Sequence, residues 1–292
     1  MEYKDKLNER IELINGALKE YLKPKYPERL YEAMNYSVFA GGKRLRPVLL
    51  LSACEAVGGD INRALPFACA MEMIHTYSLI HDDLPAMDND DFRRGKPTCH
   101  KQFDEALAIL AGDGLLTMAF EVMLEAVCRE NERSFAKAAR LIANYSGSEG
   151  MLVGQVVDIE SEGKKIDDKT LMFIHDNKTG GLIKAALMAG ALIGGADGDT
   201  VRNFVKIGYN MGIAFQIKDD ILDLTSTQEV LGKPVLSDVR NEKQTYVSLY
   251  GLDNAQQDYE TLSAGAVKMI GDLGEKADFL KWYACSLVNR EK

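Results

Sequence analysis

The chain has 292 residues, 46% of them hydrophobic, which is enough to bury a large core in one domain or in two closely joined ones. The net charge of −9 makes nucleic acid and anionic membranes poor candidates for the main partner, so any bound anion must be held by local basic groups. The five cysteines are scattered and lack the close spacing of a zinc site, which indicates a reducing compartment.

Nearly the whole chain has the apolar periodicity of helices. Apolar residues recur every three or four positions over 3–22, 28–40, 46–57, 61–83, 102–128, 133–162, 168–193, 199–224 and 253–289. No alternating stretch of strand length competes, and no low-complexity linker divides the chain. We therefore expect a single all-α domain over residues 1–292. No run approaches the roughly 20 apolar residues of a membrane span, so we expect a cytoplasmic protein without stable membrane insertion.

An acidic cluster ends the predicted helix over residues 61–83. Asp82 and Asp83 lie at its last turn, and Pro85 then forces the chain out of helical register. Asp88 can therefore bend back toward the same point. Clustered carboxylates in apolar surroundings repel one another, and Mg²⁺ relieves both the repulsion and the cost of desolvation.

A second acidic cluster lies in the predicted helix over residues 199–224. It comprises Asp219, Asp220 and Asp223. Asp219 and Asp223 are one turn apart, so both project from one face. A solvent-exposed acidic face is the alternative interpretation for either cluster alone. Two clusters, each flanked by apolar residues, favour metal binding instead, and bound Mg²⁺ in turn points to a phosphate-bearing substrate.

Three basic segments supply positive charge for such a substrate. The segment Gly41-Gly42-Lys43-Arg44-Leu45-Arg46-Pro47 opens a helix, where backbone N–H groups and cations combine around phosphate. Arg93 and Arg94 follow the first acidic cluster, and Asn177-Lys178-Thr179-Gly180-Gly181 interrupts a helical pattern. Taken alone, the first segment is equally consistent with an ordinary charged turn, and the third with a kink or a cap. Together they carry more positive charge than one phosphate needs, so two diphosphates fit better.

Two histidines precede the first acidic cluster. His75 and His81 are six residues apart on the helix that leads into Asp82, and their position favours anion binding by His75. A metal-dependent phosphohydrolase of the His-Asp type is a rival interpretation. That class needs more histidine ligands than this pattern offers, because the second cluster contains none.

The motifs closely resemble those of the short-chain trans-isoprenyl diphosphate synthases, and most of all those of bacterial members that make farnesyl diphosphate. The resemblance is carried by residues 72–95, 39–47, 150–158, 178–180, 215–223 and 243–246, in the family's order. It covers roughly residues 36–250. A set of this size is highly specific, whereas any one motif is not.

The resemblance implies a bundle of long helices around a central catalytic cleft, usually as a homodimer, with three Mg²⁺ per active site. It assigns the isopentenyl diphosphate pocket to Lys43, Arg46, His75 and Arg94. It assigns contacts with the allylic diphosphate to Arg93, Lys178, Thr179, Gln216 and Lys233. The implied metal ligands are Asp82, Asp88 and Asp219, with Asp83 and Asp223 in support. Leu236 departs from the family's usual glycine, which puts the loop after Lys233 in doubt.

The implied reaction condenses isopentenyl diphosphate with dimethylallyl and geranyl diphosphate by ionisation, condensation and proton elimination. Ser78 lies one turn before Asp82, so it and its neighbour Tyr77 sit beneath the bound diphosphate, where the hydrocarbon tail must descend. An aromatic ring at the position of Tyr77 is associated in the family with a farnesyl product. Geranylgeranyl diphosphate synthesis, a terpene cyclase and a non-catalytic subunit are the alternatives. The second basic pocket argues against a cyclase, and the two complete clusters argue against a non-catalytic chain.

Overall fold

The computed structural model describes residues 2–225 and 244–288, and these fold almost entirely into helices. The first half contains α1 (Glu2–Tyr21), α2 (Glu28–Val38), α3 (Leu45–Ala56), α4 (Ile61–Asp82), α5 (Cys99–Gln102), α6 (Glu105–Glu130) and α7 (Arg133–Ser146). A short hairpin of two two-residue strands, β1 (Phe92–Arg93) and β2 (Lys96–Pro97), lies between α4 and α5. The all-α prediction is confirmed, but this hairpin was not expected.

The second half contains α8 (Met151–Glu160), α9 (Asp168–Ile174), a π-helical turn (His175–Thr179), α10 (Gly180–Ile193), α11 (Gly198–Thr225), α14 (Tyr246–Tyr250), α15 (Leu252–Gly271), a 3₁₀ turn (Glu275–Ala277) and α16 (Asp278–Val288). The prediction of one helix over 133–162 is wrong, because residues 147–150 separate α7 from α8. At Gly150 the chain passes close to the end of α7. A Cβ there would lie 2.1 Å from the Tyr145 carbonyl oxygen, so a residue larger than glycine does not fit. The predicted helix over 253–289 is likewise divided, into α15 and α16.

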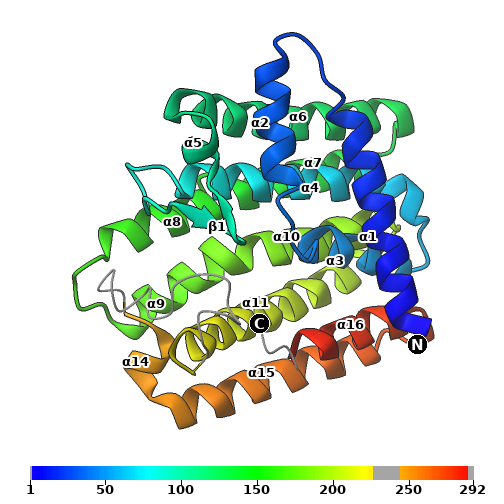
Figure 1. Cartoon of the computed structure of the whole chain (residues 1–292). Coiled ribbons are helices and arrows are strands. Elements are labelled where there is room, and N and C mark those ends of the chain that lie inside the picture. Colours follow the sequence, from blue (N-terminus) through cyan, green and yellow to red (C-terminus); the bar gives the residue numbers. More distant parts are fainter. Residues whose placement is uncertain (1, 226–243, 289–292) are drawn as a thin grey trace.

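The helices stack in rows, with α4, α6 and α7 at the top of Figure 1, α3 and α10 across the middle, and α11, α15 and α16 below. Direct packing of α4 on α6, α3 on α10, and α10 on α11 builds the main core. A smaller apolar cluster, including Ile217, Tyr246 and Tyr259, joins α11 to α14 and α15. Helix α4 therefore rests on the main core, whereas α11 contributes to both the main core and the smaller cluster.

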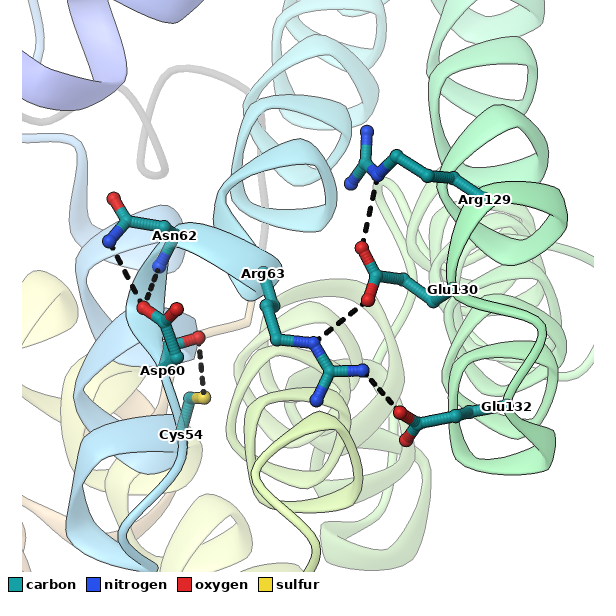
Figure 2. Close-up of polar contacts among 7 residues, drawn as sticks. All are labelled: Cys54, Asp60, Asn62, Arg63, Arg129, Glu130 and Glu132. Carbon is teal, nitrogen blue, oxygen red and sulfur yellow. Dashed lines mark hydrogen bonds and ion pairs between the residues drawn. The ribbon is translucent and has the colours of Figure 1, made fainter.

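Side-chain contacts fix the start of α4, the helix that ends in the first acidic cluster (Figure 2). Asp60 caps it by accepting a hydrogen bond from the Asn62 backbone N–H at 2.9 Å. Arg63 pairs with Glu130 at 2.9 Å and with Glu132 at 2.5 Å, which ties this end of α4 to the turn between α6 and α7. Solvent-screened pairs of this kind contribute little to stability, so they locate the helix end more than they hold the fold.

Helix α6 is apolar enough, by length and composition, to cross a membrane. The expectation that no segment reaches this threshold is therefore wrong. A core helix of a globular protein passes the same test, and α6 packs on α2, α4, α5 and α7. Only part of it is covered within this chain, since Leu110 and Leu124 are both 57% exposed.

Candidate active site

The first acidic cluster surrounds the C-terminal end of α4. The backbone N–H of Asp88 donates to the carbonyl oxygen of Asp82 at 2.9 Å, so the chain does bend back after Pro85. Burial, reinforced by the charge of Asp88, raises the pKa of Asp82 to about 6, while the Lys178 ammonium opposes the shift. The negative charge of Asp82 is therefore only partly compensated by protein groups, and a cation would relieve it.

Asp83 is held differently from Asp82. It is buried, and the Arg93 Nε lies 2.8 and 2.9 Å from its two carboxylate oxygens. Arg93 belongs to β1, and at the hairpin turn Arg94 (φ 54°) and Gly95 (φ 75°) adopt the left-handed conformation. Arg94 donates to the Gly41 carbonyl oxygen. The hairpin thus places Arg93 against the first acidic cluster and Arg94 against the glycine loop before α3.

The glycine loop, residues 41–44, leads into α3, and Gly41, Gly42 and Arg44 have positive φ. Gly41 (φ 105°) and Gly42 (φ 127°) adopt conformations that favour glycine, and Lys43 is exposed. Arg44 turns inward and pairs with Glu72 at 2.7 Å in the core. Arg44 is therefore a structural residue, unlike its exposed neighbour Lys43.

Arg46, at the start of α3, and His75, on α4, lie close enough for the charge of Arg46 to act on the His75 ring. The buried Arg46 Nε has no hydrogen-bond partner within the described part of the chain, and burial lowers the pKa of Arg46 to about 10. Burial and the nearby Arg46 and Arg94 lower the pKa of His75 well below its usual value, so His75 is neutral at pH 7. An anion placed here would give the Arg46 guanidinium the acceptor that it lacks.

A cavity of about 450 Å³, here called the main cavity, joins these groups. Arg46, His75 and Asp82 line it together with Lys178 and Thr179. Its remaining lining is mostly apolar and includes Leu84, Met87, Ile109, Met151 and Leu152. One hollow therefore has charged and polar groups beside an apolar compartment, as a diphosphate with a hydrocarbon tail requires.

Tyr77 and Ser78 both line the main cavity, as predicted from their spacing to Asp82. The Tyr77 side chain is buried and its ring packs edge-on against the His81 ring, with 5.7 Å between the centroids. The Ser78 hydroxyl donates to the His75 carbonyl oxygen at 2.9 Å. The Tyr77 ring is thus fixed in place, which suits a barrier to a growing chain.

The second acidic cluster lies on α11 and belongs to a hydrogen-bonded network. Asp220 is buried and accepts from the Tyr246 backbone N–H at 2.7 Å and from the Gln216 Nε2 at 2.9 Å. The Thr179 hydroxyl donates to the Gln216 Oε1 at 2.8 Å. Asp219 is half-buried and Asp223 is buried. The charge of Asp219 reaches Arg46, so the second cluster and the basic pocket share one electrostatic environment.

The donor set fits Mg²⁺ bound jointly with a substrate. Within residues 2–225 and 244–288, no three carboxylate, histidine or cysteine side chains lie close enough to hold a metal by themselves. Mg²⁺ commonly takes one or two carboxylates and completes its shell with water and substrate phosphate oxygens. The Asp82 carboxylate, whose charge is only partly compensated, lies beside Arg46 and Lys178 in the main cavity and matches that pattern.

Several polar residues beside the site were missed from the sequence. Asp158 pairs with Lys178 at 2.6 Å, and the buried Gln155 lines the main cavity. His175, with its pKa lowered to about 4 by burial, lies beside Asp220. The only signal in the sequence was that Gln155 and Asp158 fall inside a motif that resembled the family. Lys233 and Leu236 lie outside the described residues.

The family model for polyprenyl synthetase matches residues 27–277 of the chain. The farnesyl diphosphate synthase of Geobacillus stearothermophilus is 51% identical over 86% of this chain and 85% of its own length. The geranylgeranyl diphosphate synthase of Cyanophora paradoxa is 44% identical over 97% of this chain and 95% of its own. A solved Helicobacter pylori geranyltransferase, complexed with magnesium and isoprenyl diphosphate, is 32% identical over 94% of each chain, with a TM-score of 0.81. The chain belongs to the polyprenyl synthetase family.

Proposed function

We propose that this protein is a farnesyl diphosphate synthase, which condenses isopentenyl diphosphate with dimethylallyl and then geranyl diphosphate. The observation that carries the proposal is the main cavity, in which Asp82, the Arg46–His75 pair and the buried Tyr77 ring line a single hollow. The 51% identity to a farnesyl diphosphate synthase supports the same product. We further infer that residues 1–292 act as one domain, because the site draws on helices from both halves of the chain.

Magnesium is the metal that the carboxylates suit best. Asp82, Asp88 and Asp219 would hold Mg²⁺, with Asp83 and Asp223 in support, and three ions would offset the charge of a diphosphate together with that of the carboxylates of the two clusters. When bound, the ions stabilise the negative charge that develops on the departing diphosphate.

The chain's own residues supply the remaining steps. Arg93 and Lys178 offset the charge of the allylic diphosphate, while Lys43, Arg46, His75 and Arg94 bind isopentenyl diphosphate. The Lys178 backbone carbonyl, the Thr179 hydroxyl and the Gln216 amide oxygen offer partial negative charge to the allylic cation. The apolar lining excludes water from that cation. The isopentenyl double bond attacks the cation, and the proton is lost to the departing diphosphate, so no side-chain base is required.

Geranylgeranyl diphosphate is the alternative product, and relatives with that name are also similar to the chain. The buried ring of Tyr77 favours farnesyl, because it occupies the wall of the cavity five residues before Asp82 on α4. A His-Asp phosphohydrolase is disfavoured, since the His81 Nε2 lies 3.1 Å from the Ile109 carbonyl oxygen and its ring packs on Tyr77.

Product analysis tests this proposal. The protein is incubated with Mg²⁺, isopentenyl diphosphate and each allylic primer in turn, and the dephosphorylated alcohols are separated by chromatography. We expect farnesol from the unmodified protein, longer alcohols from Tyr77→Ala, and farnesol again from Tyr77→Phe, which keeps the ring. Mostly geranylgeraniol from the unmodified protein, or an unchanged profile for Tyr77→Ala, would contradict the assignment of Tyr77 as the barrier.

A homodimer and a cytoplasmic location complete the proposal. Helix α8 exposes an apolar stripe of Leu152 (45%), Val156 (51%) and Ile159 (39%), and α6 exposes Leu110 and Leu124. Exposed apolar side chains grouped on one helix face are suited to burial against a second copy of the chain. In sedimentation velocity we expect a dimer that Leu110→Glu with Leu124→Glu dissociates, whereas Leu252→Glu, on exposed α15, does not. A monomeric unmodified protein would exclude the dimer without affecting the assigned reaction.

A further inference from the structure

The inward face of α8 contacts the π-helical turn at two points. Gly154 and Asp158 are one helical turn apart and lie on the same side of α8. A Cβ on Gly154 would lie 2.3 Å from the Lys178 backbone nitrogen, so the two backbones touch there. One turn further along α8, the Asp158 carboxylate meets the Lys178 ammonium at 2.6 Å. Helix α8 therefore locates both the backbone and the charged end of Lys178.

The Lys178–Asp158 pair lies at the boundary between two hollows. Lys178 and Thr179 line both the main cavity and a second, mostly polar cavity of about 100 Å³. Asp158 lines the polar cavity, and Asp82 lines the main cavity. The positive charge of Lys178 also acts on Asp82, so the ammonium has carboxylates on both sides.

We propose that Asp158 is a positioning residue for prenyl transfer, which holds the Lys178 ammonium beside the allylic diphosphate and away from Asp82. This inference rests on the proposed function of the site. Lysine has four rotatable side-chain bonds, and fixing them before the substrate arrives lowers the entropy cost of binding. Without Asp158, the ammonium is free to pair with Asp82, where it would compete with a divalent cation for the same oxygens.

The kinetic test uses Asp158→Asn, which keeps the shape of the side chain and removes its charge. We expect the KM for the allylic substrate and the Mg²⁺ concentration for half-maximal activity each to rise about tenfold. The KM for isopentenyl diphosphate should change less than twofold. Unchanged allylic KM and Mg²⁺ dependence in a folded Asp158→Asn protein would overturn the proposal.

A second background separates positioning from a general structural role. Lys178→Met keeps most of the lysine stem and removes the ammonium, so Asp158→Asn should add no further loss when combined with it. Equal losses in the presence and absence of the Lys178 ammonium would show that Asp158 acts by another route, and would overturn the proposal.

Asp176→Asn is the matched control. It removes an equivalent ion pair of the same π-helical turn, Lys184–Asp176 at 2.7 Å, whose two residues are not among those lining the two cavities. We expect no change in the allylic KM or the Mg²⁺ dependence. The same changes as in Asp158→Asn would assign the effect to loosening of the turn and would overturn the proposal. Absence of prenyl transfer by the unmodified protein would instead refute the proposed function, so the two failures are distinguishable.

Discussion

The two acidic clusters look alike in sequence but are held in different ways. In the first, Asp82 lies at a helix end, and burial raises its pKa to about 6. In the second, Asp220 is enclosed by hydrogen bonds from Gln216 and the Tyr246 backbone. The first cluster therefore keeps a charge that a ligand must offset, whereas the second uses one aspartate to hold α14 against α11. Similar acidic motifs can divide binding and structure between their members.

The largest expected effect comes from removing a predicted metal ligand from either cluster. Asp82→Asn and Asp219→Asn should each lower turnover by about 10²–10³-fold or more, because charge on the departing diphosphate would be left uncompensated. Asp253→Asn, an exposed position on α15, is the control and should retain normal turnover. Near-normal turnover in either cluster variant, with the fold intact, would refute a mechanism that needs both clusters.

Stability should separate Asp220 from Asp82. Asp220→Ala leaves the Tyr246 N–H and the Gln216 amide without their acceptor, so we expect the free energy of unfolding to fall by about 2–4 kcal/mol. Asp82→Ala removes a carboxylate whose charged form is disfavoured by burial, and should not destabilise the metal-free protein. Urea denaturation in the presence of a chelator measures both. Equal destabilisation would show that the two clusters do not differ in this way.

His175 gives the surroundings of the second cluster a pH dependence. Burial lowers its pKa to about 4, so between about pH 6.5 and 4 the unfolded chain binds more protons than the folded protein. The stability that the neutral His175 ring contributes is therefore fully present above pH 6.5 and is lost as the pH falls through 4. Between pH 7 and 4, the unmodified protein should lose up to about 3 kcal/mol more than His175→Phe. Parallel stability curves for the two proteins would contradict the shift.

The smallest expected effect separates the two diphosphates. Arg46→Ala should mainly raise the KM for isopentenyl diphosphate, and Lys178→Ala should mainly impair binding or ionisation of the allylic substrate, each by about tenfold. Steady-state kinetics with one substrate varied at a time measure the effect. If Arg46→Ala raises both Michaelis constants equally, Arg46 does not belong to one substrate alone.

Local patterns predicted much of the fold. The helix expected over 199–224 is α11 at 198–225, and the interruption expected at residues 177–181 is the π-helical turn, displaced by two residues. The split of 133–162 was missed, because it depends on how closely Gly150 approaches α7. The family is confirmed by the polyprenyl synthetase match.

Contacts between residues far apart in the chain could not be predicted from the sequence. Asp158 and Lys178 are 20 residues apart, and Asp220 and Tyr246 are 26 apart. Helical periodicity indicates which face each residue occupies, but not which other helix covers that face. The predicted roles of Arg93 and Gln216 illustrate the limit, since in the structure they bond to Asp83 and Asp220.

The π-helical turn allows one continuous helical segment to serve two cores. A π turn holds one residue more than an α turn, so the side chains beyond it are rotated by about 100° from their α-helical register. Leu171, before the turn, packs in the smaller apolar cluster, and Leu182, after it, packs in the main core. Shortening the segment by a single residue would restore regular geometry but point one of these leucines toward the wrong neighbours. The additional residue in this turn thus lets the helix before it pack in the smaller apolar cluster and the helix after it pack in the main core.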